Sequence, residues 1–167
     1  MRVLRYLVGL LLFVPLAGCF SLEGPIFSAA DGVEVANVIG TYETTDGEEV
    51  MVAAPDDDYD YRLRVREGGD VQEAVLRFIR MGNYHLAQLH DGTGAEPGSL
   101  IFIVTVDAYG VKMHLPPQTD VAQLARQYRL QLTGANDLSG NEDVMPAFLE
   151  EVVAMNMVSD YVLLRKR

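Results

Sequence analysis

Residues 100–106 read LIFIVTV, a run that is apolar on both of its alternating faces. Successive side chains of a β-strand point to opposite faces of the sheet, so this run predicts a strand that is buried on both sides. Such a strand lies in the middle of a sheet, with one face on the core and the other face covered by another element. We expect a helix to cover the outer face.

Shorter runs with strand character lie on both sides of this central strand, at a spacing of about ten residues, and each ends in a turn signal. The clearest is residues 61–66, YRLRVR, where apolar and charged side chains alternate as in a half-buried strand. Gly82-Asn83 predicts the reversal of a hairpin. The predicted strands begin at Gly40 and continue with residues 48–54, 61–66, 71–81, 84–90, 100–106, 111–115 and 160–164.

Two helices are predicted near the C-terminus. The first is capped by Thr119 or Asp120, and its apolar residues are spaced as on one helix face. These apolar residues are Val121, Leu124, Ala125 and Tyr128. The second helix runs from Glu142 to about Met155, with Pro146 in its first turn, where proline is tolerated.

Together these elements predict a mainly β domain (α+β). We expect an antiparallel meander barrel or a strongly curved sheet of about seven to eight strands, with two helices near the C-terminus and a final strand. Residues 38–167 are assigned to this single domain, and residues 133–140 are interpreted as a loop. Residues 19–37 mix glycine, proline and small polar residues without sustained periodicity, which predicts a tether.

The first residues of the chain predict where the protein is located. Arg2 and Arg5 give a positively charged start, and the apolar run from Tyr6 to Ala17 follows. This run has about 12 residues, whereas a membrane-spanning helix needs about 20. The layout is therefore typical of a secretory signal. Cys19 is the only cysteine, so no disulfide can form within the chain.

Leu16-Ala17-Gly18-Cys19 resembles the lipobox of bacterial lipoproteins. The resemblance implies that residues 1–18 are a cleaved signal peptide. It also implies that Cys19 becomes the first residue of the mature chain, with a diacylglycerol on its sulfur and an acyl chain on its amine. We therefore expect a lipid-anchored membrane protein of the cell envelope. An aspartate directly after the lipobox cysteine would resemble a signal for retention in the inner membrane. This chain has Phe20 at that position, which favours attachment to the outer membrane, facing the periplasm.

Gly40-Thr41-Tyr42 is similar to the Gly-x-Trp signature that opens the barrel of lipocalin-like bacterial lipoprotein domains. The similarity covers about residues 38–115 as a pattern, with tyrosine in place of tryptophan. It implies a barrel whose interior could hold an apolar or lipid-like ligand. The interior residues that would bind this ligand are Leu63, Val65, Leu76, Phe78, Phe102 and Val104.

The same side chains could instead pack the interior solid. In that case the alternative is a non-enzymatic module of the envelope that binds another protein, as an assembly accessory or an inhibitor. The sequence leaves both alternatives open.

The charge of the chain argues against nucleic acid as a partner. Loss of Arg2 and Arg5 with the signal changes the formal net charge from −11 to −13. Binding of phosphate backbones needs a clustered positive field. The densest basic cluster, Arg62, Arg64 and Arg66, lies beside a run of aspartates and is interpreted as a solvated strand face. An acidic domain is repelled by an anionic membrane, so we assign membrane attachment to the acyl chains on Cys19.

One acidic run has the spacing of a calcium site. Asp56, Asp58, Asp60 and Glu67 occupy positions 1, 3, 5 and 12 of a calcium-binding loop. Tyr61 stands where that loop needs glycine, so we do not expect the loop to form. A calcium site of another geometry at residues 56–58 stays open.

The three histidines do not predict a shared metal site. His85 and His90 lie five residues apart on one predicted strand and would point to opposite faces, and His114 is interpreted as a surface residue. The sequence contains no Gly-x-Ser-x-Gly, His-Glu-x-x-His or Walker motif. We therefore predict no catalytic residues, no metal and no cofactor.

Overall fold

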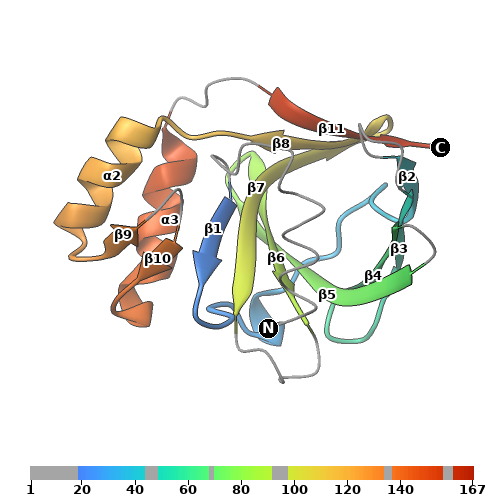
Figure 1. Ribbon diagram of the computed structural model, residues 1–167, viewed down its shortest axis with the longest axis horizontal. Coiled ribbons are helices and arrows are strands. Elements are labelled where there is room, and N and C mark those ends of the chain that lie inside the picture. Colours follow the sequence, from blue (N-terminus) through green and yellow to red (C-terminus); the bar gives the residue numbers. More distant parts are fainter. Residues whose placement is uncertain (1–18, 44–48, 68–69, 92–97, 134–136, 156–159) are drawn as a thin grey trace.

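The computed structural model describes residues 19–43, 49–67, 70–91, 98–133, 137–155 and 160–167, which form strands and a few short helices (Figure 1). The strands are β1 (Cys19–Leu22), β2 (Gly40–Glu43), β3 (Glu49–Pro55), β4 (Asp60–Glu67), β5 (Asp70–Met81), β6 (Tyr84–His90), β7 (Ser99–Asp107), β8 (Gly110–His114), β9 (Gln131–Thr133), β10 (Asp137–Ser139) and β11 (Asp160–Lys166). The helices are η1 (Ala29–Asp31), α2 (Gln118–Gln127), η2 (Glu142–Val144) and α3 (Met145–Ala154).

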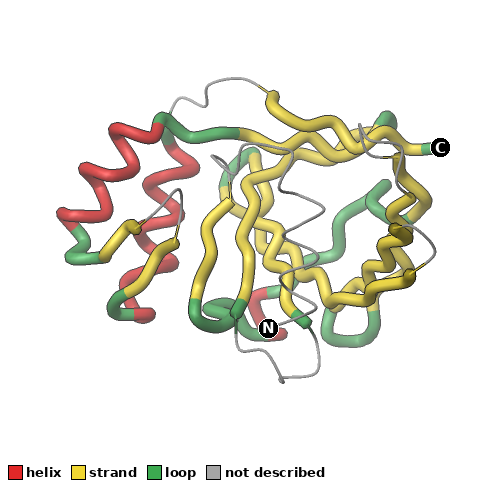
Figure 2. The backbone as a smooth tube through the Cα atoms, in the orientation of Figure 1, coloured by secondary structure: helices red, strands yellow, loops and turns green. Residues whose placement is uncertain are grey.

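Strands β2 to β8 pair with their neighbours along the chain as antiparallel hairpins. β11 returns from the C-terminus and lies between β2 and β8. The strand order is β6-β5-β4-β3-β2-β11-β8-β7-β1-β10-β9, and β6 also pairs with β7. The sheet therefore curls strongly enough for β6 to hydrogen-bond to both β5 and β7 (Figure 2).

β7 is buried on both faces, as predicted. Leu100, Phe102 and Val104 face the inside of the curl, where they join the inner core, a cluster built mainly from β2 to β8. Ile101 and Ile103 face the other way and are fully buried in the helix core, the cluster that includes α2 and α3. The strand thus separates two cores.

The two helices cover the outer face of the sheet at β5 to β7. The side chains that fill the helix core from α2 and α3 include Val121, Leu124, Phe148, Leu149 and Val152. They pack on Ile79 of β5 and Leu86 of β6 as well as on β7. This confirms the predicted helical cover. Pro146 lies in the first turn of α3, as predicted, whereas α2 begins at Gln118 after Pro117, earlier than Thr119 or Asp120 would place it.

A mainly β fold with two C-terminal helices and a final strand is confirmed, and its sheet is antiparallel except for the parallel pairing of β1 with β10. The predicted number of strands is too low, because the described sheet has eleven. β9 and β10 lie within or beside residues 133–140, which were expected to form a loop. Each has three residues, too few for an alternating pattern to be recognised in the sequence.

The prediction of a tether at residues 19–37 is wrong. β1 pairs with β7 from Cys19↔Phe102 to Leu22↔Ser99. The side chains of Phe20 and Leu22 are only 2% and 4% exposed, and Phe27 and Val35 are also buried. Glycine and proline do make this segment irregular after Leu22, but its apolar side chains belong to the two cores. The predicted signal peptide, residues 1–18, lies outside the described residues.

Candidate functional site

The six predicted interior residues come together in one place. Val65, Leu76, Phe78, Phe102 and Val104 are buried members of the inner core, and Leu63 packs against them. They come from three strands, β4, β5 and β7, and they lie on the face of these strands that is inside the curl. The structure thus brings the predicted set together as an apolar cluster of closely packed side chains.

Residues 33–38 close one end of the inner core. The amide of Val33 donates to the carbonyl of Phe78 at 2.9 Å, and the amide of Val35 donates to Tyr61 Oη at 2.8 Å. The Tyr42 hydroxyl donates to the carbonyl of Val38. Burial raises the pKa of both Tyr42 and Tyr61, so these two hydroxyls stay protonated at neutral pH. The chain itself therefore occupies this end of the interior.

The Gly40-Thr41-Tyr42 motif has a structural role. Gly40 has a φ of 151°, and a Cβ at this position would come within 2.6 Å of the Cε atom of Lys166. Glycine thus lets the C-terminal strand pass close to the start of β2. Tyr42 is fully buried in the inner core two residues later.

A buried glutamine fastens the N-terminal segment to the sheet. Gln88 of β6 is 0% exposed. Its Oε1 atom accepts hydrogen bonds from the amides of Ile26 and Phe27 at 3.0 and 3.1 Å, and its Nε2 atom donates to the carbonyl of Phe27 at 3.1 Å. The side chain therefore satisfies backbone groups that no strand pairs, which is what a buried irregular segment requires.

Two more polar side chains hold the same segment. Ser99 Oγ donates to the carbonyl of Gly24 at 2.8 Å, and Arg77 Nη1 donates to the carbonyl of Phe27 at 2.9 Å. Arg77 also forms a bidentate pair with Asp60, with both N···O distances at 2.8 Å. Sequence reasoning missed these residues. The available signal was the presence of arginine, glutamine and serine inside strands that are otherwise buried on both faces.

The acidic run at residues 56–60 makes a turn between β3 and β4. Asp56 Oδ1 accepts from the amides of Asp58 and Asp60 at 3.0 Å each. The carboxylate of Asp60 is engaged by Arg77. In the part of the chain that the structure describes, no group of three or more His, Cys, Asp or Glu side chains could hold a metal ion.

The histidines lie apart, and one differs from its prediction. His114 is 8% exposed and is therefore not a surface residue. Its Nε2 atom lies 2.8 Å from Thr105 Oγ1, and its ring meets the ring of Tyr84 edge-on at 5.0 Å. On β8 it pairs with Ile103 of β7, which belongs to the helix core, so His114 lies beside that core and not at the surface. His85 lies inside the curl against Phe78, with its Nδ1 atom buried and without a hydrogen-bond partner among the described residues.

The stability of the protein should depend on these histidines at mildly acidic pH. Burial lowers the pKa of His85, as does the charge of Arg80, and burial lowers the pKa of His90. A lowered pKa means that the unfolded chain, in which histidine titrates near 6.5, binds more protons than the folded protein. The stabilisation is therefore complete above about pH 6.5 and declines as the pH falls below it.

We expect the melting temperature to fall by about several degrees between pH 7.5 and pH 5. In the double variant His85→Gln/His90→Gln the fall should be smaller, because glutamine does not titrate. Differential scanning calorimetry of both proteins at both pH values checks this. Equal falls in the two proteins would contradict it.

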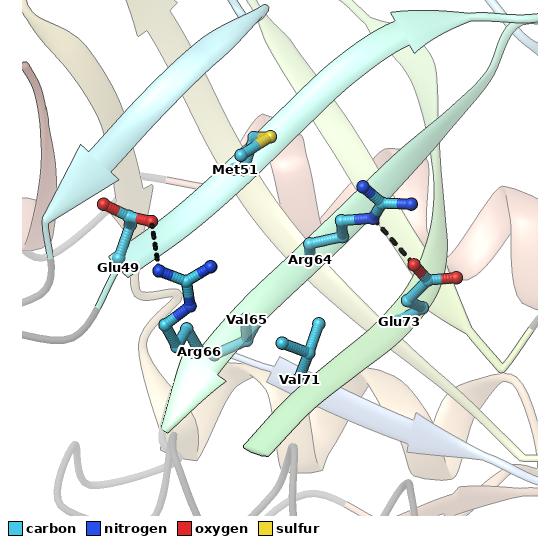
Figure 3. Close-up of a pocket in the computed structure, with 7 residues that line it drawn as sticks. All are labelled: Glu49, Met51, Arg64, Val65, Arg66, Val71 and Glu73. Atoms are coloured by element: carbon cyan, nitrogen blue, oxygen red, sulfur yellow. Dashed lines mark hydrogen bonds and ion pairs between the residues drawn. The ribbon is translucent and has the colours of Figure 1, made fainter. Parts of the chain in front are cut away.

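A shallow groove lies on the outer face of β3, β4 and β5 (Figure 3). Its volume is about 140 Å³. Its lining residues are Glu49, Met51, Arg64, Val65, Arg66, Val71 and Glu73. Met51 and Val71 are 39% and 54% exposed, although both are apolar. We call this region the outer groove.

Two ion pairs flank the apolar residues of the outer groove. Arg64 Nε lies 2.7 Å from Glu73 Oε1, and Arg66 Nη1 lies 3.9 Å from Glu49 Oε1 (Figure 3). Arg62, Arg64 and Arg66 are all exposed, which confirms the predicted solvated strand face. The groove thus combines exposed apolar surface with charges of both signs.

Comparison with protein-family models, curated proteins and solved structures finds no match to this chain. The lipocalin-like resemblance therefore depends on residues 40–42 and on the pattern of strands. Within the described ranges, no helix has the length and apolar character needed to cross a membrane.

Proposed function

We propose that this chain is a lipoprotein of the bacterial cell envelope, anchored by lipid on Cys19 in the outer membrane and facing the periplasm. The proposal rests on the lipobox-like sequence at residues 16–19, which follows a short apolar run with a basic start. The anchor is also needed, because a body with a formal charge of −13 would not bind an anionic bilayer by itself.

Replacing Cys19 by serine should block both lipid attachment and cleavage. We expect the wild-type protein to fractionate with membranes and the Cys19→Ser variant to lose its mature, lipidated form. Mass spectrometry of the N-terminal peptide, together with membrane fractionation, measures both effects. Ser21→Ala is the matched control, because it changes a nearby residue and leaves the cysteine intact. A mature, membrane-bound Cys19→Ser protein would overturn the anchor.

For the body we propose a non-enzymatic role as a module that binds another envelope protein through the outer groove. The interior side chains of the inner core pack against one another. This packing favours a binding surface on the outside of the domain over a binding site in its interior. Met51 and Val71 expose apolar surface between two ion pairs, and exposed apolar surface with a polar rim is typical of protein interfaces.

A photo-crosslinking amino acid at Met51 should capture this partner in intact cells. The same amino acid at Tyr109, which is 79% exposed in the turn between β7 and β8, is the control for random collisions. We expect a discrete adduct from Met51 that is absent from Tyr109 and is lost when Val71→Asp is added. Adducts of equal yield at both positions would count against the outer groove.

A second candidate function is the binding of an apolar or lipid-like ligand in a lipocalin-like barrel. It is favoured by the convergence of Leu63, Val65, Leu76, Phe78, Phe102 and Val104 in one apolar interior. A ligand would have to separate these side chains. Purified protein that carries extractable lipid, or that binds a fluorescent fatty acid, would support this function over the first.

A further inference from the structure

We infer that the mature protein is mounted on the bilayer without a flexible linker, so that a fixed end of the molecule faces the lipid headgroups. This membrane-facing end comprises the turn between β5 and β6 and the start of α2. The inference rests on the proposed lipid anchor at Cys19. It goes beyond that proposal because it assigns the orientation of the body and the surface that meets the membrane.

The first step is that the chain has no flexible segment directly after Cys19, because residues 19–22 form β1. β1 makes four residue pairs with β7, and the first of them is Cys19↔Phe102. Phe20 and Leu22 are almost completely buried in the helix core, where Phe20 meets the ring of Phe148 edge-on at 5.9 Å. Release of β1 as a tether would expose both side chains and leave residues 99–102 of β7 unpaired on the edge that β8 continues (Figure 1).

The second step is that the residues after β1 are also held. Ser99, Gln88 and Arg77, from β7, β6 and β5, hydrogen-bond to the backbone of residues 24–27. If residues 19–37 were flexible, their root-mean-square length would be about 25 Å. In the folded protein these residues do not extend away from the domain, because their apolar side chains belong to the two cores. The separation between body and lipid is then set by the lipidated cysteine itself.

The third step identifies the end of the molecule that faces the membrane. β6 pairs with residues 99–104 of β7, so β1 and β8 must both pair with the opposite edge. Along that edge Phe102 pairs with Cys19 and the next residue, Ile103, pairs with His114. β1 therefore starts where β8 ends, and α2 begins four residues after His114. The lipid on Cys19 is attached at this junction.

The turn between β5 and β6 is the part of this junction that suits lipid headgroups, whereas β11 and α2 bring Asp160 and Asp120 to it. Tyr84 contacts His114, and the preceding turn presents the exposed residues Gly82 and Asn83. Arg80, also exposed, lies at the same end of β5. Tyrosine and basic side chains are favoured at the membrane interface, and residues 80–84 contain no acidic residue. The other end of β5, at Val71, lies about 35 Å away along the strand.

The test uses the mature lipoprotein, whose only native cysteine is blocked by its lipid. Asn83→Cys and Val71→Cys each add one free thiol, at the two ends of β5, for an environment-sensitive fluorophore. The labelled proteins are reconstituted into phosphatidylethanolamine and phosphatidylglycerol vesicles that contain a headgroup nitroxide lipid. We expect quenching at least about tenfold greater at Asn83 than at Val71, because short-range nitroxide quenching does not reach across about 35 Å.

A linker variant supplies the matched control. Insertion of about ten glycine and serine residues between Cys19 and Phe20 adds roughly 16–19 Å of flexible reach and leaves residues 20–22 able to pair with β7. Quenching at Asn83 should then fall towards the Val71 value.

Three outcomes contradict the inference in distinguishable ways. A protein that lacks lipid by mass spectrometry and leaves the vesicles overturns the anchor and the mounting together. A lipidated, vesicle-bound protein with equal quenching at both sites overturns the mounting and leaves the anchor intact. Quenching at Asn83 that does not change on insertion of the linker also overturns the mounting alone.

Discussion

Replacement of Arg77 by methionine is expected to lower the free energy of unfolding by about 2–4 kcal/mol, somewhat below the range for fully buried ion pairs. Arg77 is 8% exposed and binds both oxygens of Asp60, whose side chain is 19% exposed. Methionine keeps much of the apolar volume but leaves the carboxylate without its cation. The carbonyl of Phe27 also loses one of its two donors. The N-terminal segment should therefore loosen together with the ion pair.

Arg64→Met is the matched control for Arg77→Met. Arg64 also pairs with a glutamate on a neighbouring strand, but the two side chains are 54% and 53% exposed. Loss of such a pair costs about 1 kcal/mol or less. Denaturation in urea gives both values, and hydrogen exchange at the amides of Ile26 and Phe27 reports the N-terminal segment. Equal losses in the two variants would show that Arg77 is not a fastening residue.

Replacement of Phe148 by alanine is expected to cost about 3–5 kcal/mol. Phe148 is fully buried in α3, and its ring meets Phe20 and Tyr128 edge-on, each at 5.9 Å. It thus joins α3 to β1 on one side and to the end of α2 on the other. Truncation would leave a cavity where these three elements meet, so the loss should include the cavity term as well as the transfer of the ring to water.

Tyr109→Ala provides the comparison for Phe148→Ala, because it removes an aromatic ring that is 79% exposed. We expect its effect to lie within about 0.5 kcal/mol of zero. Limited proteolysis distinguishes local from global effects, since loosening of the helix layer should create cleavage sites in α2 and near β1. A loss below about 1 kcal/mol for Phe148→Ala would contradict the described helix core.

The strands and helices that were predicted correctly are those with strong local patterns. Residues 61–66 alternate between apolar and charged side chains, and residues 100–106 are apolar on both faces. Each pattern therefore indicates which faces of its strand are buried. Gly82 marks a turn in which it has a φ of 58°, a conformation that glycine adopts at little cost. Prediction succeeded here because the residues that determine each strand or turn lie within that strand or turn.

The features that were missed depend on contacts between distant residues. β1 is a strand because β7, about 80 residues later in the chain, offers it an edge. The hydrogen bonds of Gln88 to residues 26 and 27 span 62 and 61 positions, and no local pattern identifies them. His114 is buried beside Ile103 of β7 and the ring of Tyr84 on β6, which are not its neighbours in sequence. The outer groove likewise needs three strands to be placed side by side before Met51 and Val71 line the same surface.

The position of β11 has a consequence for how the protein is made. The last strand of the chain inserts between β2 and β8, and Arg165 pairs with Glu43 across 122 positions. Until residues 160–166 have been synthesised, β2 and β8 each lack their β11 neighbour, so the pairing of the curled sheet becomes complete only when this strand is added.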